Sequence, residues 1–195
     1  YDRKMGWDRQ QHLGKEFYGD YGCFDFSMTI SSNYVMEATG AITNEAEVLP
    51  KELREKLDIK NFVKAGTKLD KSVLPYVPGQ KKTWRYHAIN VHDVAWTADP
   101  SYRIGEANWN GIRIISLAQE GHAWGWQNAA DYTAKVIAYY STRVGMYAYP
   151  KMVVADAQDG MEYPMLTLDG GWDPNYRDLL AHEVGHNWFF GMVGN

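Results

Sequence analysis

The chain has 195 residues, of which 20 are lysine or arginine and 24 are aspartate or glutamate, so its formal net charge is −4. Hydrophobic residues make up 45% and charged residues 23%, which is typical of a globular protein and excludes a largely disordered one. The mild negative charge argues against nucleic-acid binding, because phosphate contacts need clustered lysine and arginine. No apolar run approaches the roughly 20 residues that a membrane-spanning helix needs.

The single cysteine, Cys23, excludes an internal disulfide framework and a cysteine-based zinc cluster. Because it lies beside Phe24, we expect it to be a small buried hydrophobe rather than a reactive thiol. One cysteine is compatible with either redox compartment, so the localisation stays open. The chain begins at Tyr1 without a charged-then-apolar leader, and we expect it to be a piece of a longer protein.

Strand patterns dominate the first part of the chain. Alternation of apolar and polar side chains with a period of two predicts half-buried strands over residues 24–30, 34–38, 83–91 and 112–117. Residues 50–57 predict a short helix that begins at a proline. Residues 64–82 are rich in lysine, glycine and proline, and they predict a loop.

Helical patterns enter after about residue 118. Residues 128–143 place apolar side chains every three or four positions, which indicates one buried face of a helix. Short strands are predicted over residues 151–155 and 165–168, and a final helix over residues 173–190 with Asp173 as its N-cap. The change in pattern predicts an α+β fold whose second part differs from its β-rich first part.

The final predicted helix contains His182, Glu183 and His186 in the order His-Glu-x-x-His. Two histidines four residues apart lie on the same side of a helix, so their imidazoles can converge on one metal ion. Glu183 could then act as the general base that takes a proton from a metal-activated water as the water attacks a carbonyl. The alternative is a pair of structural histidines on a buried helix face, which the burial of three polar side chains makes unfavourable.

The third metal ligand is missing from the segment that follows the motif. The nine residues after His186 contain no aspartate, glutamate, histidine or cysteine. A third histidine six residues after His186 is also absent, which excludes the metzincin pattern. We therefore expect a carboxylate ligand beyond Asn195, with Asp156, Asp159 and Asp169 as upstream alternatives. Two histidines alone would bind zinc weakly and without turnover.

A second group, Gly160, Met161 and Glu162, lies about twenty residues before the histidines. A glycine between two short strands lets the backbone approach a ligand closely. Glu162 could hold a substrate ammonium group by a charge-assisted hydrogen bond. Taken alone, the segment favours a turn that carries a solvated acidic residue.

Together the two groups resemble the aminopeptidase N family of gluzincin zinc metallopeptidases. Residues 160–162 read Gly-Met-Glu, and residues 182–188 read His-Glu-Val-Gly-His-Asn-Trp, in the order and at the spacing of that family. Residues 23–40 and 91–99 resemble strands of the family's N-terminal β domain. The resemblance therefore extends over nearly the whole chain, although it covers only part of the family's length.

The resemblance implies a fold in two domains. Residues 1–118 would be the C-terminal portion of the N-terminal β domain, a remnant of a β-sandwich or saddle. Residues 119–195 would be the first half of a thermolysin-like zincin catalytic domain. This half would end before the third zinc ligand of the family, a glutamate about nineteen residues past His186, and before its transition-state tyrosine.

The resemblance also implies roles for the residues of both motifs. His182 and His186 would bind one Zn²⁺ ion, and Glu183 would be the general base. Glu162 would hold the free α-amine of the substrate, and the backbone at residues 160–161 would pair with the substrate peptide.

We therefore expect a zinc aminopeptidase, which hydrolyses the first peptide bond of a peptide substrate with a free N-terminus. An endopeptidase of the same zincin class is one alternative, since Asp159 and Tyr163 stand where the family motif has glycine and asparagine. A truncated, non-catalytic binding module is the second alternative, because the third ligand is missing.

Overall fold

The computed structural model of the chain describes residues 3–9, 19–64 and 73–193. The structure mixes helices and strands, and its first part is rich in strands, which confirms these two features of the predicted fold. No helix within these described ranges is both long enough and apolar enough to cross a membrane. In chain order, the elements are β1 (Gly22–Ser31), β2 (Val35–Ala38), β3 (Ala41–Ile42), α1 (Glu45–Val48), α2 (Lys51–Leu57), η1 (Ile59–Asn61), β4 (Lys81–Val91), β5 (Trp96–Asp99), β6 (Tyr102–Trp109), β7 (Ile112–Gln119), η2 (Ala123–Gly125), α3 (Ala129–Arg143), β8 (Lys151–Ala157), β9 (Met161–Tyr163), β10 (Leu166–Gly170) and α4 (Arg177–Phe189).

A five-stranded sheet with the order β6-β7-β8-β10-β9 forms the centre of the described structure. Strand β8 runs parallel to both β7 and β10, whereas β6 and β9 are antiparallel to their neighbours. Parallel neighbours need a long crossover connection, which helix α3 supplies between β7 and β8. Strand β9 pairs with β10 and lies at one edge of the sheet.

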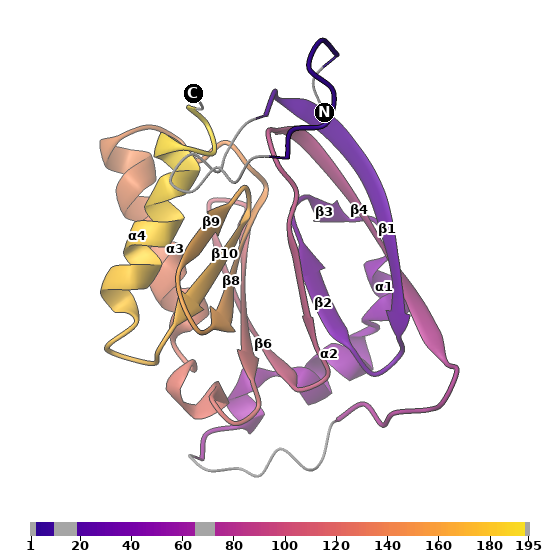
Figure 1. The fold of residues 1–195 in the computed structure, drawn as a ribbon. Coiled ribbons are helices and arrows are strands. Elements are labelled where there is room, and N and C mark those ends of the chain that lie inside the picture. Colours follow the sequence, from indigo (N-terminus) through magenta and orange to yellow (C-terminus); the bar gives the residue numbers. More distant parts are fainter. Residues whose placement is uncertain (1–2, 10–18, 65–72, 194–195) are drawn as a thin grey trace.

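Both faces of the central sheet are buried, which explains the nearly continuous apolar runs of β7 and β8. Successive side chains alternate between two cores. Ile114 and Val154 pack with helices α3 and α4, whereas Ile115 and Val153 pack with the β-rich part. Figure 1 shows the two helices on one side of the sheet and strands β1 to β4 on the other. The two parts of the chain therefore share one sheet as their common layer.

The β-rich part covers its face of the central sheet with two smaller sheets, β1-β4-β3 and β2-β5. Its side of the core contains Met36, Trp84 and Tyr86, all buried. Aromatic side chains of this size bury a large apolar area each, so a few of them suffice to fill the space between the layers.

The structure places Cys23 on the outer face of β1, where it is exposed. The expectation of a buried cysteine is therefore wrong. The period of two in β1 turns Phe24 and Phe26 toward the interior and leaves Cys23 and Asp25 on the solvent side. Because Cys23 is the neighbour of Phe24 in a strand, its side chain lies on the face opposite that of Phe24.

The strands and helices predicted from periodicity are confirmed for β1, β2, β4, β7, β8, β10, α2 and α3, with ends that differ by at most two residues. Of the predicted loop over residues 64–82, residues 65–72 lie outside the described part, and β4 already begins at Lys81. Strands β3, β5, β6 and β9 and the short helix α1 were not predicted from these patterns. Gly105 weakens the strand pattern in β6, and three residues are too few for a period in β9.

Helix α4 begins at Arg177, four residues later than predicted, and Asp173 is not its N-cap. The carboxylate of Asp173 instead accepts hydrogen bonds from Nε of Arg177, at 2.7 Å, and from the side-chain amide of Asn128, at 3.2 Å. The polar side chain thus links the start of α4 to the start of α3.

The predicted domain boundary at residue 118 falls within the central sheet. Strand β6 precedes the boundary and β8 follows it. Strand β7, which ends at Gln119, pairs with both β6 and β8. The division into residues 1–118 and 119–195, and the thermolysin-like character of the second part, stay predictions.

A buried ion pair joins the β-rich part to the central sheet. Nζ of Lys151 on β8 lies 2.6 Å from Oε2 of Glu37 on β2, and the two side chains are 7% and 4% exposed. The ammonium group also lies 5.1 Å from the centre of the Tyr86 ring. Burial lowers the pKa of Lys151, and the negative charge of Glu37 opposes this shift.

Replacing one partner of this pair should destabilise the fold strongly. In Lys151→Met the Glu37 carboxylate stays buried without its counter-charge, and we expect the free energy of unfolding to fall by about 3–5 kcal/mol. The double variant Glu37→Leu/Lys151→Met should lose much less, since it buries no charge. Denaturant unfolding of the three proteins measures both values. A single variant as stable as the wild type would contradict this assignment.

Candidate metal centre

Helix α4 carries the His-Glu-x-x-His motif and is oriented by a buried apolar stripe. Leu180, Val184 and Trp188 recur every four residues and pack into the core between the central sheet and α3. This packing fixes the rotation of the helix about its axis. The helix positions beside the stripe carry His182, which is exposed, and His186, which is half-buried.

The two imidazoles converge on each other. Nε2 of His182 lies 3.0 Å from Nε2 of His186, and the ring planes stand at 88° with their centres 4.5 Å apart. A tetrahedral zinc ion with Zn–N distances of about 2.0–2.1 Å would separate two nitrogen ligands by about 3.3 Å. The observed separation is close to this value, so the histidines fit as two ligands of one ion.

Glu183 points from the same helix toward the β9–β10 hairpin, and its side chain is almost fully buried. Its Oε2 atom is buried and has no hydrogen-bond partner among the described residues. Burial raises the pKa of Glu183 to about 7, and the negative charge of Glu162 adds to the shift. A carboxylate with this pKa is suited to accept a proton near neutral pH.

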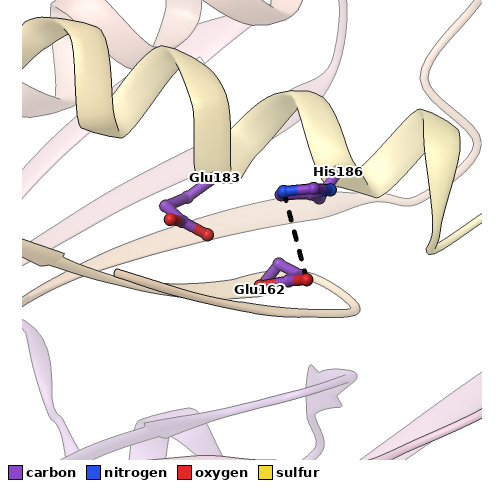
Figure 2. A group of neighbouring side chains, drawn as sticks. All are labelled: Glu162, Glu183 and His186. Atoms are coloured by element: carbon purple, nitrogen blue, oxygen red, sulfur yellow. Dashed lines mark ion pairs between the residues drawn. The ribbon is translucent and has the colours of Figure 1, made fainter. Parts of the chain in front are cut away.

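Glu162 reaches the motif from strand β9, where it pairs with Thr167 of β10 in the hairpin register. Oε1 of Glu162 lies 4.0 Å from Nε2 of His186. Ligand atoms of Glu162, Glu183 and His186 all lie within 4.8 Å of one another. Figure 2 shows Glu183 and His186 projecting from α4 toward Glu162 on the strand beneath. Carboxylate oxygens and imidazole nitrogens are donors that zinc accepts, so this donor set fits a divalent cation.

The three upstream aspartates do not join this group in the described structure. Asp156 accepts a hydrogen bond from the ring of His122 at 2.8 Å, and Asp159 accepts one from the N–H of Gly160 at 2.9 Å. Asp169 is fully buried, and burial raises its pKa to about 7. The alternative in which one of them is the third ligand has no support from this geometry.

Gly160 lies directly against the general-base candidate. A β-carbon at this position would overlap with Oε1 of Glu183 and would come within 2.8 Å of its Cδ and 2.9 Å of Cδ1 of Leu179. The sequence interpretation assigned Gly160 to close contact with a substrate. The structure shows that the missing side chain also makes room for the carboxylate of Glu183.

Strand β9 offers its outer edge beside these side chains. It pairs with β10 on one side and ends the sheet on the other. The backbone groups on an edge of this kind can pair with an additional extended chain. Gly160 and Met161, which were predicted to contact a peptide, lie at the start of this edge.

Two side-chain hydrogen bonds near the site were not predicted from the sequence. His122 pairs with Asp156, which lies 34 residues away in the sequence. Asn187 follows the second histidine of the motif, and its buried side chain bonds to Met165. Neither contact has a local sequence signal, since each joins elements that only the fold brings together.

Comparisons with known proteins give likenesses in structure but none in sequence family. No protein-family profile matches the chain, and no curated protein matches it. The chain is similar in structure to a mutant M1 zinc metallopeptidase from Deinococcus radiodurans, with a TM-score of 0.62 and 15% sequence identity. The likeness covers 90% of this chain and 36% of that one, so the chain spans about a third of the other protein's length. At 15% sequence identity, this similarity is evidence for the fold alone.

Adding one methyl group at Gly160 should displace the Glu183 carboxylate. In Gly160→Ala we expect a loss of about 1–3 kcal/mol in unfolding free energy, because the site is overpacked. A crystal structure of the variant should show Glu183 moved away from residue 160. The control is Gly145→Ala, since a β-carbon at Gly145 meets nothing within 4 Å. An unmoved Glu183 in a fully stable Gly160→Ala variant would contradict the expectation.

Proposed function

We propose that the chain is part of a zinc-dependent metallopeptidase of the aminopeptidase type, which removes the first residue of peptides with a free N-terminus. The observation that carries the proposal is the 3.0 Å approach of the His182 and His186 nitrogens, with the carboxylates of Glu162 and Glu183 grouped around His186. His182 and His186 would hold one zinc ion, and the resemblance to gluzincins implies that a further carboxylate would complete the ligand set. When bound, zinc supplies Lewis-acid polarisation of a carbonyl and lowers the pKa of a water molecule.

Glu183 is the proposed general base. Its carboxylate is held between helix α4 and Gly160, so its position is restricted before any substrate arrives. The pKa of about 7 lets the group accept a proton from water and return it to the leaving amine. Acceptance requires the ionised form, so this step is favoured as the pH rises toward and through that value.

Glu162 is the proposed binder of the substrate's α-ammonium group. Its side chain is 20% exposed, so a ligand can reach it, and it lies beside the edge of β9. A peptide added to this edge in an extended conformation would place its first residue next to the carboxylate. A charge-assisted hydrogen bond there would favour cleavage at the first peptide bond over internal bonds.

The general base can be tested by removing its charge while keeping its shape. In Glu183→Gln, introduced into a longer form of the protein that includes the third zinc ligand, hydrolysis of aminoacyl arylamides should fall by about 10²–10⁴-fold, because no group accepts the proton. Zinc affinity, measured by calorimetry, should change little, since Glu183 is not a proposed ligand. Glu55→Gln is a matched control on an exposed side chain of α2. Unchanged hydrolysis in Glu183→Gln would rule out this role.

The aminopeptidase assignment depends on Glu162 and has its own test. In Glu162→Ala, hydrolysis of substrates with a free α-amine should fall by at least about tenfold, the loss expected for one charge-assisted hydrogen bond. Cleavage of peptides with a blocked N-terminus should be negligible in the wild type. If internal cleavage is substantial and survives in Glu162→Ala, the protein is an endopeptidase of the same class.

A further inference from the structure

The turn between β9 and β10 contains a residue in an unusual backbone conformation. Met165 has φ +63°, in the left-handed region that residues other than glycine rarely adopt. The residue is also buried, with 1% of its surface exposed. A conformation of this kind persists where surrounding contacts hold it in place.

Asn187 supplies one of these contacts from helix α4. Its Oδ1 atom accepts a hydrogen bond from the backbone N–H of Met165 at 2.9 Å and from the hydroxyl of Tyr147 at 3.3 Å. The backbone N–H of Met165 can only donate, so the side-chain oxygen of Asn187 must face it. Asn187 is 1% exposed, so water cannot easily replace these bonds.

Thr39 supplies a second contact from the β-rich part. Its hydroxyl donates to the carbonyl oxygen of Pro164 at 2.9 Å and accepts from the backbone N–H of Ala95 at 3.1 Å. Thr39 is fully buried as well. The turn at Pro164 and Met165 is therefore held from two sides, by elements that lie far apart in the sequence.

The Asn187 contact links the hairpin that carries Glu162 to the helix that carries His186, and the Thr39 contact links the same hairpin to the β-rich part. Asn187 directly follows His186 on α4, and Met165 lies three residues after Glu162. A shift of the turn relative to α4 would change the 4.0 Å separation between Glu162 and His186. Within the described part of α4, Asn187 is the residue whose side chain hydrogen-bonds to this turn.

We propose that Asn187 and Thr39 are positioning residues that clamp the β9–β10 turn and so fix Glu162 relative to the histidines. The consequence for amine recognition rests on the proposed function, whereas the clamp itself does not. Asn187→Leu has a similar size and leaves the buried N–H of Met165 without an acceptor. Asn187→Asp keeps the acceptor oxygens and serves as the conservative variant.

Hydrogen exchange measured by mass spectrometry tests the clamp directly. In Asn187→Leu and Thr39→Val, amides of residues 161–170 should exchange at least about tenfold faster than in the wild type, because the turn opens more often. Asn187→Asp should restore protection to near the wild-type level. Ile137→Val is the control for lost stability, since it removes one buried methyl group from α3. Equal exchange of residues 161–170 in Asn187→Leu and Asn187→Asp would overturn the proposal.

A ligand pair tests whether the clamp positions Glu162. Alanine hydroxamate and its N-acetyl derivative, bound to the zinc-loaded protein, differ in the free amine. The ratio of their affinities should fall about tenfold in Asn187→Leu and should stay constant in Ile137→Val. Faster exchange with an unchanged ratio would overturn the positioning role. A wild-type ratio near one would instead contradict amine binding by Glu162, and the exchange data would still decide the clamp.

Discussion

The close packing of helix α4 on its neighbours is the constraint on which the rest of the site depends. A β-carbon at Gly185 would come within 2.8 Å of the hydroxyl of Tyr140, so the glycine in the motif lets α4 lie directly on α3. The indole of Trp188 stacks near the same tyrosine, with ring centres 5.1 Å apart, and donates to the carbonyl of Gly145. With the helix held on this side, Glu183 and His186 project toward Glu162 on β9.

The site concentrates carboxyl groups in partly buried surroundings. Burial raises the pKa of both Glu183 and Asp169, and in each case a nearby carboxylate adds to the shift. One oxygen of each group is buried without a hydrogen-bond partner in the described structure. Like charges near each other favour a proton on one of them. Of these two carboxyl groups, Glu183 alone belongs to the set of described residues that could hold a metal ion, together with Glu162 and His186.

The β-rich part is more than a cover for one face of the central sheet. Its side chains share a core with β7 and β8, and the Glu37–Lys151 pair crosses the same interface. Thr39 reaches the hairpin that carries Glu162. The contacts that shape the site thus come from both parts of the chain. This agrees with a sheet whose strands lie on both sides of the predicted boundary at residue 118.

Local features of the chain were readable from the sequence because their causes are local. A period of two or of about 3.6 identified most strands and helices, and four-residue spacing placed His182 and His186 on one side of a helix. The period of two in β1 already indicates that Cys23 lies on the face opposite Phe24. Only the tertiary structure decided the approach of Glu162 to His186. It also decided that Gly160 makes room for Glu183. These outcomes depend on how the sheets, the hairpin and the helix pack together. Contacts between segments that are distant in the sequence produce no periodic pattern in the amino-acid sequence, so they could not be predicted from it.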